Sequence, residues 1–221
     1  MPRRTPNPKP LLAVLMGVAF FGGSCTVQKM LGPARETPSD QEVARLLGDS
    51  AKEPESGPKL IAAAQAMVSE QIRVGQRYHP YAMVFGLVLV TLYSFAFVFG
   101  LRAWNFAHGA TGPLAKVAVL VLPARVAVAA VDLAAAKALE PATQAMVVAF
   151  AQAQKAAVPP EQAEAVTRMM SQAAPWVTLS LEIGSALFVC VLFQVAWRYF
   201  QRKEVVAYFD KMAGPPPDPE E

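Results

Sequence analysis

Residues 80–101 read PYAMVFGLVLVTLYSFAFVFGL, a stretch without a single charged side chain. A helix needs about 20 consecutive apolar residues to cross the hydrocarbon core of a bilayer, so this stretch has the length of one crossing. Tyr81 stands at its start and Trp104 just after its end, as expected of aromatic rings at the two membrane–water interfaces. The stretch therefore predicts a transmembrane helix.

Two further apolar stretches, residues 117–136 and 176–197, have a similar length. The first is rich in alanine, with Ala130 and Ala134 four residues apart, a spacing that lets helices pack closely in lipid. The whole chain is 54% hydrophobic and 17% charged, whereas soluble domains carry about 25% charged residues. We therefore expect an all-α integral membrane protein with three transmembrane helices.

Residues 1–25 have the order of parts found in a secretory signal peptide: a basic segment, the apolar run LLAVLMGVAFF and the small residues GGSC. The apolar run is short for a membrane crossing. Ser24 and Cys25 match a lipobox, the motif at which bacterial signal peptidase cuts before a lipidated cysteine, but Gly22 stands where a branched aliphatic residue is usual. We expect either a signal peptide, with Cys25 as the lipidation candidate, or an uncleaved signal anchor.

Residues 26–79 are polar and contain several prolines. Ser39 and Glu42 have the spacing of a capping box, which predicts a short amphipathic helix from about Asp40. A longer amphipathic helix is expected to follow and to end before Pro80. We expect this segment to lie outside the cytoplasm.

Residues 137–175 also have the composition of water-facing protein. Pro141 and the pair Pro159–Pro160 divide the segment into two amphipathic helices. We expect these helices to form an extracytoplasmic hairpin against the membrane surface.

Basic residues close to the apolar stretches set the expected orientation, because Lys and Arg accumulate in cytoplasmic loops. Those on the expected inner side are Arg3, Arg4, Lys9, Arg102, Lys116, Arg198, Arg202 and Lys203. Arg73 and Arg77 also lie close to a predicted crossing, on the side expected to be outside, and count against this orientation. We therefore expect residues 102–116 to be a cytoplasmic link and residues 198–221 a cytoplasmic tail, in a bacterial inner membrane. Arg198, Arg202 and Lys203 could also hold anionic lipid headgroups, although they serve the topology equally well.

Three charged residues fall inside the predicted crossings: Arg125, Asp132 and Glu182. Each such charge costs about 3 kcal/mol in hydrocarbon, so it needs an explanation. Arg125 and Asp132 are seven residues apart and share one helix face. We expect the three to form a cluster that fixes helix packing. The alternative is a proton or ion relay, or a site for a charged ligand.

No set of residues has the spacing of a catalytic or metal-binding motif. His79 and His108 are predicted on opposite sides of the membrane, so they cannot bind one metal ion together. Lys and Arg are scattered rather than gathered in a stripe, which argues against nucleic-acid binding. We expect a non-enzymatic accessory, assembly or scaffold subunit without cofactor or metal. Its partners would be membrane lipids and other membrane-protein subunits or a second copy. The alternative is a small transporter or channel component that uses the charge cluster.

Overall fold

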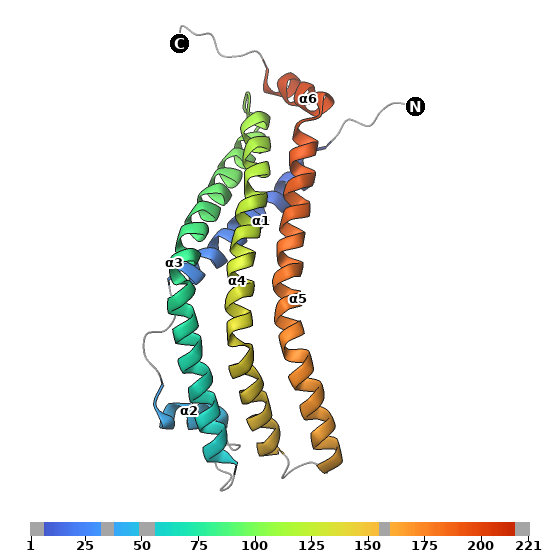
Figure 1. Ribbon diagram of the computed structural model, residues 1–221. Coiled ribbons are helices and arrows are strands. Elements are labelled where there is room, and N and C mark those ends of the chain that lie inside the picture. The colour runs from blue at the N-terminus through green and yellow to red at the C-terminus, as the bar shows by residue number, and fades with distance from the viewer. Residues whose placement is uncertain (1–6, 32–37, 49–55, 155–159, 215–221) are drawn as a thin grey trace. The chain divides into compact units, whose positions relative to one another are not determined.

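The computed structural model describes residues 7–31, 38–48, 56–154 and 160–214, and every regular element in these ranges is a helix (Figure 1). The helices are α1 (Lys9–Met30), α2 (Asp40–Leu47), α3 (Gly57–Trp104), α4 (Thr111–Gln154), α5 (Pro160–Phe200) and α6 (Lys203–Ala213). Among the described residues, α1, α3, α4 and part of α5 are long and apolar enough to cross a membrane. The all-helical fold is confirmed, and these apolar helices indicate a membrane location.

The long helices continue through prolines that the sequence analysis took as helix ends. α3 has 48 residues and contains Pro80, and α4 has 44 residues and contains Pro141. A proline inside a helix removes one N–H donor and frees one carbonyl. In membrane-associated helices neighbouring groups can satisfy that carbonyl, so the helix persists. The breaks predicted at Pro80 and Pro141 were wrong.

The chain forms two compact units, and α3, α4 and α5 each contribute to both. Unit 1 comprises Met1–Met30, Ala82–Ala129 and Gly184–Glu221, and unit 2 comprises Leu31–Tyr81 and Ala130–Ile183. Unit 1 therefore contains α1, α6 and the more apolar parts of the three long helices. Unit 2 contains α2 and the more polar parts.

The core of unit 1 is built from side chains of all five helices that contribute to it. α3 and α5 bury residues at alternating steps of four and three, as in Leu89, Tyr93 and Ala96. This spacing of buried residues is typical of two α-helices that wind around each other in a left-handed coiled coil. The rings of Tyr93 and Phe193 meet in this seam, with centroids 5.9 Å apart. One apolar core thus holds the bundle of unit 1 together.

α1 packs against α3 through glycines. A Cβ atom placed on Gly22 would lie 2.9 Å from Cε2 of Tyr93, whose ring is buried in the core. On the α3 side, a Cβ on Gly100 would lie 2.8 Å from Cγ of Met16. Small residues at such points let two helix backbones approach closely. Gly22 therefore serves helix packing.

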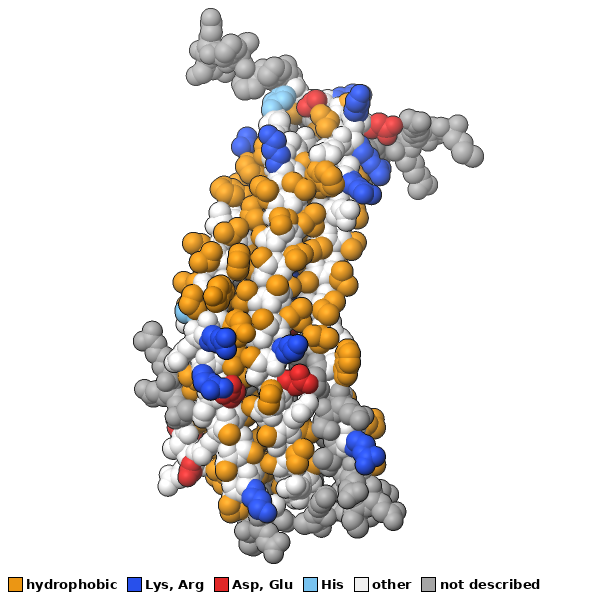
Figure 2. Space-filling model, in the orientation of Figure 1, with side chains coloured by type: hydrophobic (Ala, Val, Ile, Leu, Met, Phe, Trp, Pro, Cys, Tyr) orange, Lys and Arg blue, Asp and Glu red, His pale blue; other side chains and the backbone are white. Residues whose placement is uncertain are grey.

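The outer surface of unit 1 is apolar on each of its long helices. Large hydrophobic side chains are exposed there, namely Phe20, Phe21, Val84, Leu87, Phe95, Leu120, Val126, Leu187, Phe188 and Val191. Figure 2 shows hydrophobic side chains covering much of this face of unit 1, with Lys and Arg side chains gathered at the end that carries α6. Apolar surface of this extent is typical of a contact with lipid or protein rather than with water.

In unit 2, α2 begins with the capping box that the sequence predicted. The Ser39 hydroxyl accepts a bond from the backbone N–H of Glu42, and the Ser39 backbone N–H donates to the Glu42 carboxylate at 2.8 Å. A hydrogen bond from Gln65 to Asp40 joins α3 to α2. These bonds fix where α2 begins and hold it on α3.

Acid should weaken the start of α2. The hydrogen bonds from the backbone and hydroxyl of Ser39 hold the pKa of Glu42 below its usual value. Because the pKa of Glu42 is lower in the folded state, the ionised carboxylate stabilises α2. This stabilisation is complete above the unfolded pKa of about 4.3 and disappears as the pH falls through the lower pKa of the folded state. Hydrogen-exchange protection of α2, corrected for intrinsic rates, should therefore fall below about pH 4.

Ser39→Ala gives the matching test at neutral pH. Loss of the N-cap costs about 1 kcal/mol, so protection of α2 should fall roughly fivefold. Ser39→Ala keeps the backbone N–H that lowers the pKa of Glu42 most, so this variant should keep much of the pH dependence, whereas Glu42→Gln should lose it. An unchanged pH dependence in Glu42→Gln would show that the capping box does not control the stability of α2.

Candidate functional site

The three charged residues singled out in the sequence divide between the two units. Arg125 lies on α4 in unit 1, where its Nη2 atom donates a hydrogen bond to Oγ of Ser185 on α5 at 2.8 Å. Ser185 was missed by the sequence analysis, because a serine between glycine and alanine carries no signal of its own. The Arg125–Ser185 bond ties α4 to α5 inside unit 1.

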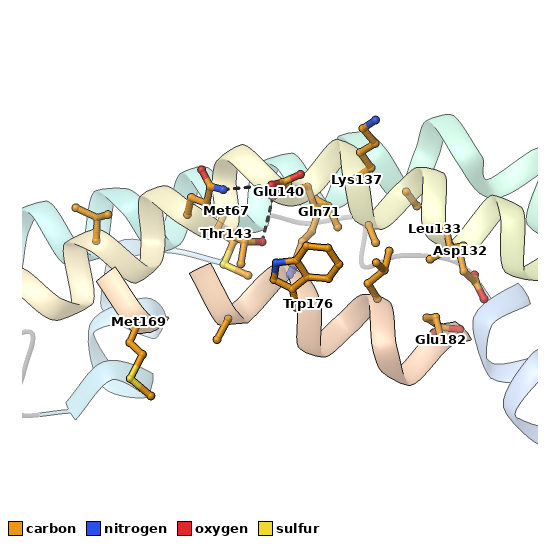
Figure 3. A pocket seen from close by; sticks show the side chains of 17 residues that line it. Met67, Gln71, Asp132, Leu133, Lys137, Glu140, Thr143, Met169, Trp176 and Glu182 are labelled. Carbon is orange, nitrogen blue, oxygen red and sulfur yellow. Dashed lines mark hydrogen bonds between the residues drawn. The ribbon is translucent and has the colours of Figure 1, made fainter. Parts of the chain in front are cut away.

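Asp132 and Glu182 belong to unit 2 and line the same cavity. Figure 3 shows their carboxyl groups together at one end of that cavity, one carried by α4 and the other by α5. The Oε2 atom of Glu182 is buried. Asp132 and Glu182 thus line one cavity of unit 2, and the cluster of Arg125, Asp132 and Glu182 stays a prediction.

The cavity of unit 2 has a volume of about 1460 Å³ and is lined by α3, α4 and α5. Its apolar lining includes Met67, Leu133, Leu139, Val148, Met169, Trp176 and Leu179. Small-molecule pockets usually measure about 300–1,000 Å³, so this cavity exceeds the usual range. It is a large apolar surface with a few polar groups.

Three other polar side chains of the cavity wall have hydrogen-bond partners on α4, their own helix. Gln144 Nε2 donates to the Glu140 carboxylate at 3.2 Å, and the Thr143 hydroxyl donates to the Leu139 carbonyl at 3.0 Å (Figure 3). Lys137 is exposed, and in Figure 3 its side chain points away from α5. The acidic pair Asp132 and Glu182 therefore forms the main charged feature that faces the cavity.

Cys25, the lipidation candidate, is exposed on α1, which continues past it to Met30. The neighbouring hydroxyls bond to their own helix, Ser24 to the Phe20 carbonyl at 3.0 Å and Thr26 to the Gly22 carbonyl at 2.7 Å. The lipobox-like segment is thus helical and packed in unit 1.

The predicted cytoplasmic residues gather at one end of unit 1. Nζ of Lys9 lies 5.4 Å from the ring centroid of Trp104 and 5.7 Å from that of Phe106. The Phe106 ring also contacts Phe209 of α6, with centroids 5.5 Å apart. The start of α1, the link at residues 105–110 and α6 therefore meet there.

Arg198, Arg202 and Lys203 occupy the end of α5 and the start of α6, at this same end of unit 1. Arg202 is the N-cap residue of α6, without a side-chain cap bond. Arg3 and Arg4 lie outside the described residues. Lys9, Arg198, Arg202 and Lys203 thus lie at one end of unit 1, whereas Arg73 and Arg77 lie on α3 in unit 2, and the orientation stays a prediction.

The part of the chain that the structure describes contains no group of three His, Cys, Asp or Glu residues able to hold a metal ion. No protein-family model matches the chain, and no curated protein and no solved structure is similar enough to it to count as a match.

Proposed function

We propose that the chain is a non-enzymatic scaffold or accessory subunit of a bacterial inner membrane. Unit 1 lies in the membrane, and unit 2 presents its helices in the extracytoplasmic space. The observation that carries this proposal is the large cavity of unit 2, built on the same three helices that enter unit 1. Its partner is another membrane-protein subunit or a second copy, and membrane lipids surround unit 1.

The orientation rests on the basic end of unit 1. Lys9, Arg102 and Lys116 belong to the end where α6 also packs. Because Lys and Arg accumulate on the cytoplasmic side, we propose that both termini lie in the cytoplasm. Four crossings, by α1, α3, α4 and α5, connect this end with the extracytoplasmic side.

In this proposal α1 is a retained signal anchor and not a cleaved signal peptide. The helix has 22 residues, enough for a crossing, because it continues through the small residues after Phe21. Leu12 and Leu15 of α1 are buried in the core of unit 1. Removing residues 1–24 would strip this core of one helix.

The three charged residues Arg125, Asp132 and Glu182 need no catalytic or transport role in this proposal. Asp132 and Glu182 belong to unit 2 and need not face hydrocarbon, so they avoid the cost of a charge in lipid. Arg125 is the one of the three within unit 1, and its bond to Ser185 joins two helices. Such a bond serves packing.

A transporter or channel that uses Arg125, Asp132 and Glu182 is less well supported. A relay through unit 1 needs further polar groups along one route, and α3 offers Thr91 and Ser94. Both are exposed on the outer surface, and both donate to carbonyls four residues earlier, at 2.8 Å and 2.9 Å. Hydroxyls bonded in this way satisfy the helix itself.

Site-specific photo-crosslinking in living cells tests the scaffold role. A benzophenone amino acid at Met169, which is 74% exposed in the cavity of unit 2, should give one polypeptide adduct of defined mass. The same amino acid at Phe188, exposed on unit 1, is the matched control and should react mainly with lipid. Absence of any polypeptide adduct from Met169, together with proton or ion flux by the purified protein in vesicles, would favour the transporter.

A further inference from the structure

We infer that the cavity of unit 2 receives an amphipathic helix that carries a basic residue. The inference rests on the proposed scaffold function and names the chemical class of the partner. Two features of the described residues carry it: the size of the cavity and the separation of its charge from its apolar wall.

The size of the cavity fits a helical segment. A helix of about 10–12 Å diameter and about 5.4 Å pitch takes roughly 420–610 Å³ per turn. The cavity of about 1460 Å³ therefore holds about two to three turns. A single small cation would leave most of the apolar wall exposed to water.

The wall of the cavity matches the apolar face of such a helix. Met67 and Met169 line it, and Trp176 stands between α4 and α5 with 67% of its surface exposed (Figure 3). Methionine side chains adapt to irregular partners, and an amphipathic helix places its apolar residues into grooves of this kind. Burying these side chains would drive association.

The charged residues that line the cavity favour a partner helix with positive charge. Asp132 and Glu182 lie at one end, and Glu140 adds a third carboxylate to the lining. Lys137 is the basic residue of the lining, and its side chain points away from α5. The three carboxylates of the lining outnumber its one basic residue, so an acidic helix would be repelled and a helix with a Lys or Arg toward the end that holds Asp132 and Glu182 would be attracted.

Binding of labelled synthetic peptides to the full-length protein tests this inference. The protein is placed in phosphatidylcholine nanodiscs, and empty nanodiscs are subtracted. The probe is a 14-residue amphipathic helix of leucine and lysine, and its control has glutamate at every lysine position. Fluorescence anisotropy should show at least tenfold tighter binding of the lysine peptide. Equal binding of the two peptides would overturn the inference.

Variants place the binding in the cavity. Ala173→Arg puts a cation on the exposed cavity wall and should weaken binding of the lysine peptide at least tenfold. Ala145→Arg, exposed on α4 outside the cavity lining, is the matched control and should bind normally. The double change Asp132→Asn with Glu182→Gln should act like Ala173→Arg. If both arginine variants bind equally, the cavity is not the site.

Two further outcomes separate the alternatives. If the lysine peptide fails to bind while dodecyltrimethylammonium binds at concentrations well below its micellar range, the occupant is a small cationic amphiphile and the helix is excluded. If crosslinking at Met169 captures a polypeptide while the peptides bind without regard to charge, the scaffold function stands and the basic partner fails. If neither experiment succeeds, both proposals fail.

Discussion

Gly22→Leu should lower the thermal midpoint of the protein in mild detergent by roughly 2–12 °C. The added side chain would begin 2.9 Å from the buried ring of Tyr93, in a core that holds α1, α3 and α5 together. Overpacking of this kind costs about 1–3 kcal/mol, and each kcal/mol shifts the midpoint by about 2–4 °C in a chain of this size. Thermal unfolding followed by circular dichroism measures the effect.

The chain offers a matched control on the same helix. Nothing lies within 4 Å of a Cβ placed on Gly17, so Gly17→Leu should leave the midpoint nearly unchanged. Replacing Tyr93 with a smaller residue in the Gly22→Leu background should recover part of the loss. Equal effects at Gly17 and Gly22 would show that α1 is not packed on Tyr93.

The same substitution distinguishes a retained anchor from a lipoprotein. Leucine at position 22 brings the segment closer to a lipobox, so a lipoprotein precursor should be processed as well as before or better. A retained α1 should instead be destabilised while the intact mass still includes residues 1–24. Cys25→Ala in the same background removes the lipidation candidate and should not rescue the midpoint. A mature chain that begins at Cys25 would overturn retention.

Phe193→Ala should destabilise unit 1 by about 2 kcal/mol, a fall of roughly 4–8 °C in the midpoint. Phe193 is 0% exposed, and its ring meets that of Tyr93 in the seam between α3 and α5. Lipid is as apolar as a protein core, so transfer of the ring contributes little. The loss comes from the cavity, at about 24 cal/mol per Å³ over about 100 Å³.

Phe188→Ala is the control for this prediction. Phe188 lies on the same helix and is 59% exposed, so a lipid or detergent chain can fill the space that the ring leaves. Its effect should stay within about 0.5 kcal/mol. If Phe188→Ala is as harmful as Phe193→Ala, the outer face of unit 1 contacts protein and not lipid.

The local composition of the sequence was enough to predict an all-helical protein. It was not enough to predict where the long helices end. The charge-free stretch at residues 80–101 and the capping box of Ser39 and Glu42 are local signals, and both correspond to helical features of the structure. Whether Pro80 and Pro141 end a helix depends on neighbours that compensate for the missing donor. That information is tertiary, so the sequence alone predicted breaks that are absent.

The candidate site was predictable in part for the same reason. Asp132 and Glu182 stood out because charge is rare in apolar sequence, and they do share a cavity wall. Ser185 and Trp176 gave no functional signal, since their roles depend on the packing of α4 and α5. Gly22 was noticed as a departure from a processing motif, and the ring of Tyr93 supplies its structural reason.

The central claim is that unit 1 crosses the membrane with unit 2 on the outer side, and labelling of single cysteines in intact cells tests it most directly. Cys25 and Cys190 are first replaced by alanine, and one cysteine is then introduced by Gln152→Cys on α4 or by Asn105→Cys in the link. A membrane-impermeant maleimide should label the Gln152→Cys protein in intact cells. It should label the Asn105→Cys protein only after the cells are permeabilised. Labelling of both without permeabilisation, or the reverse order, would contradict the claim.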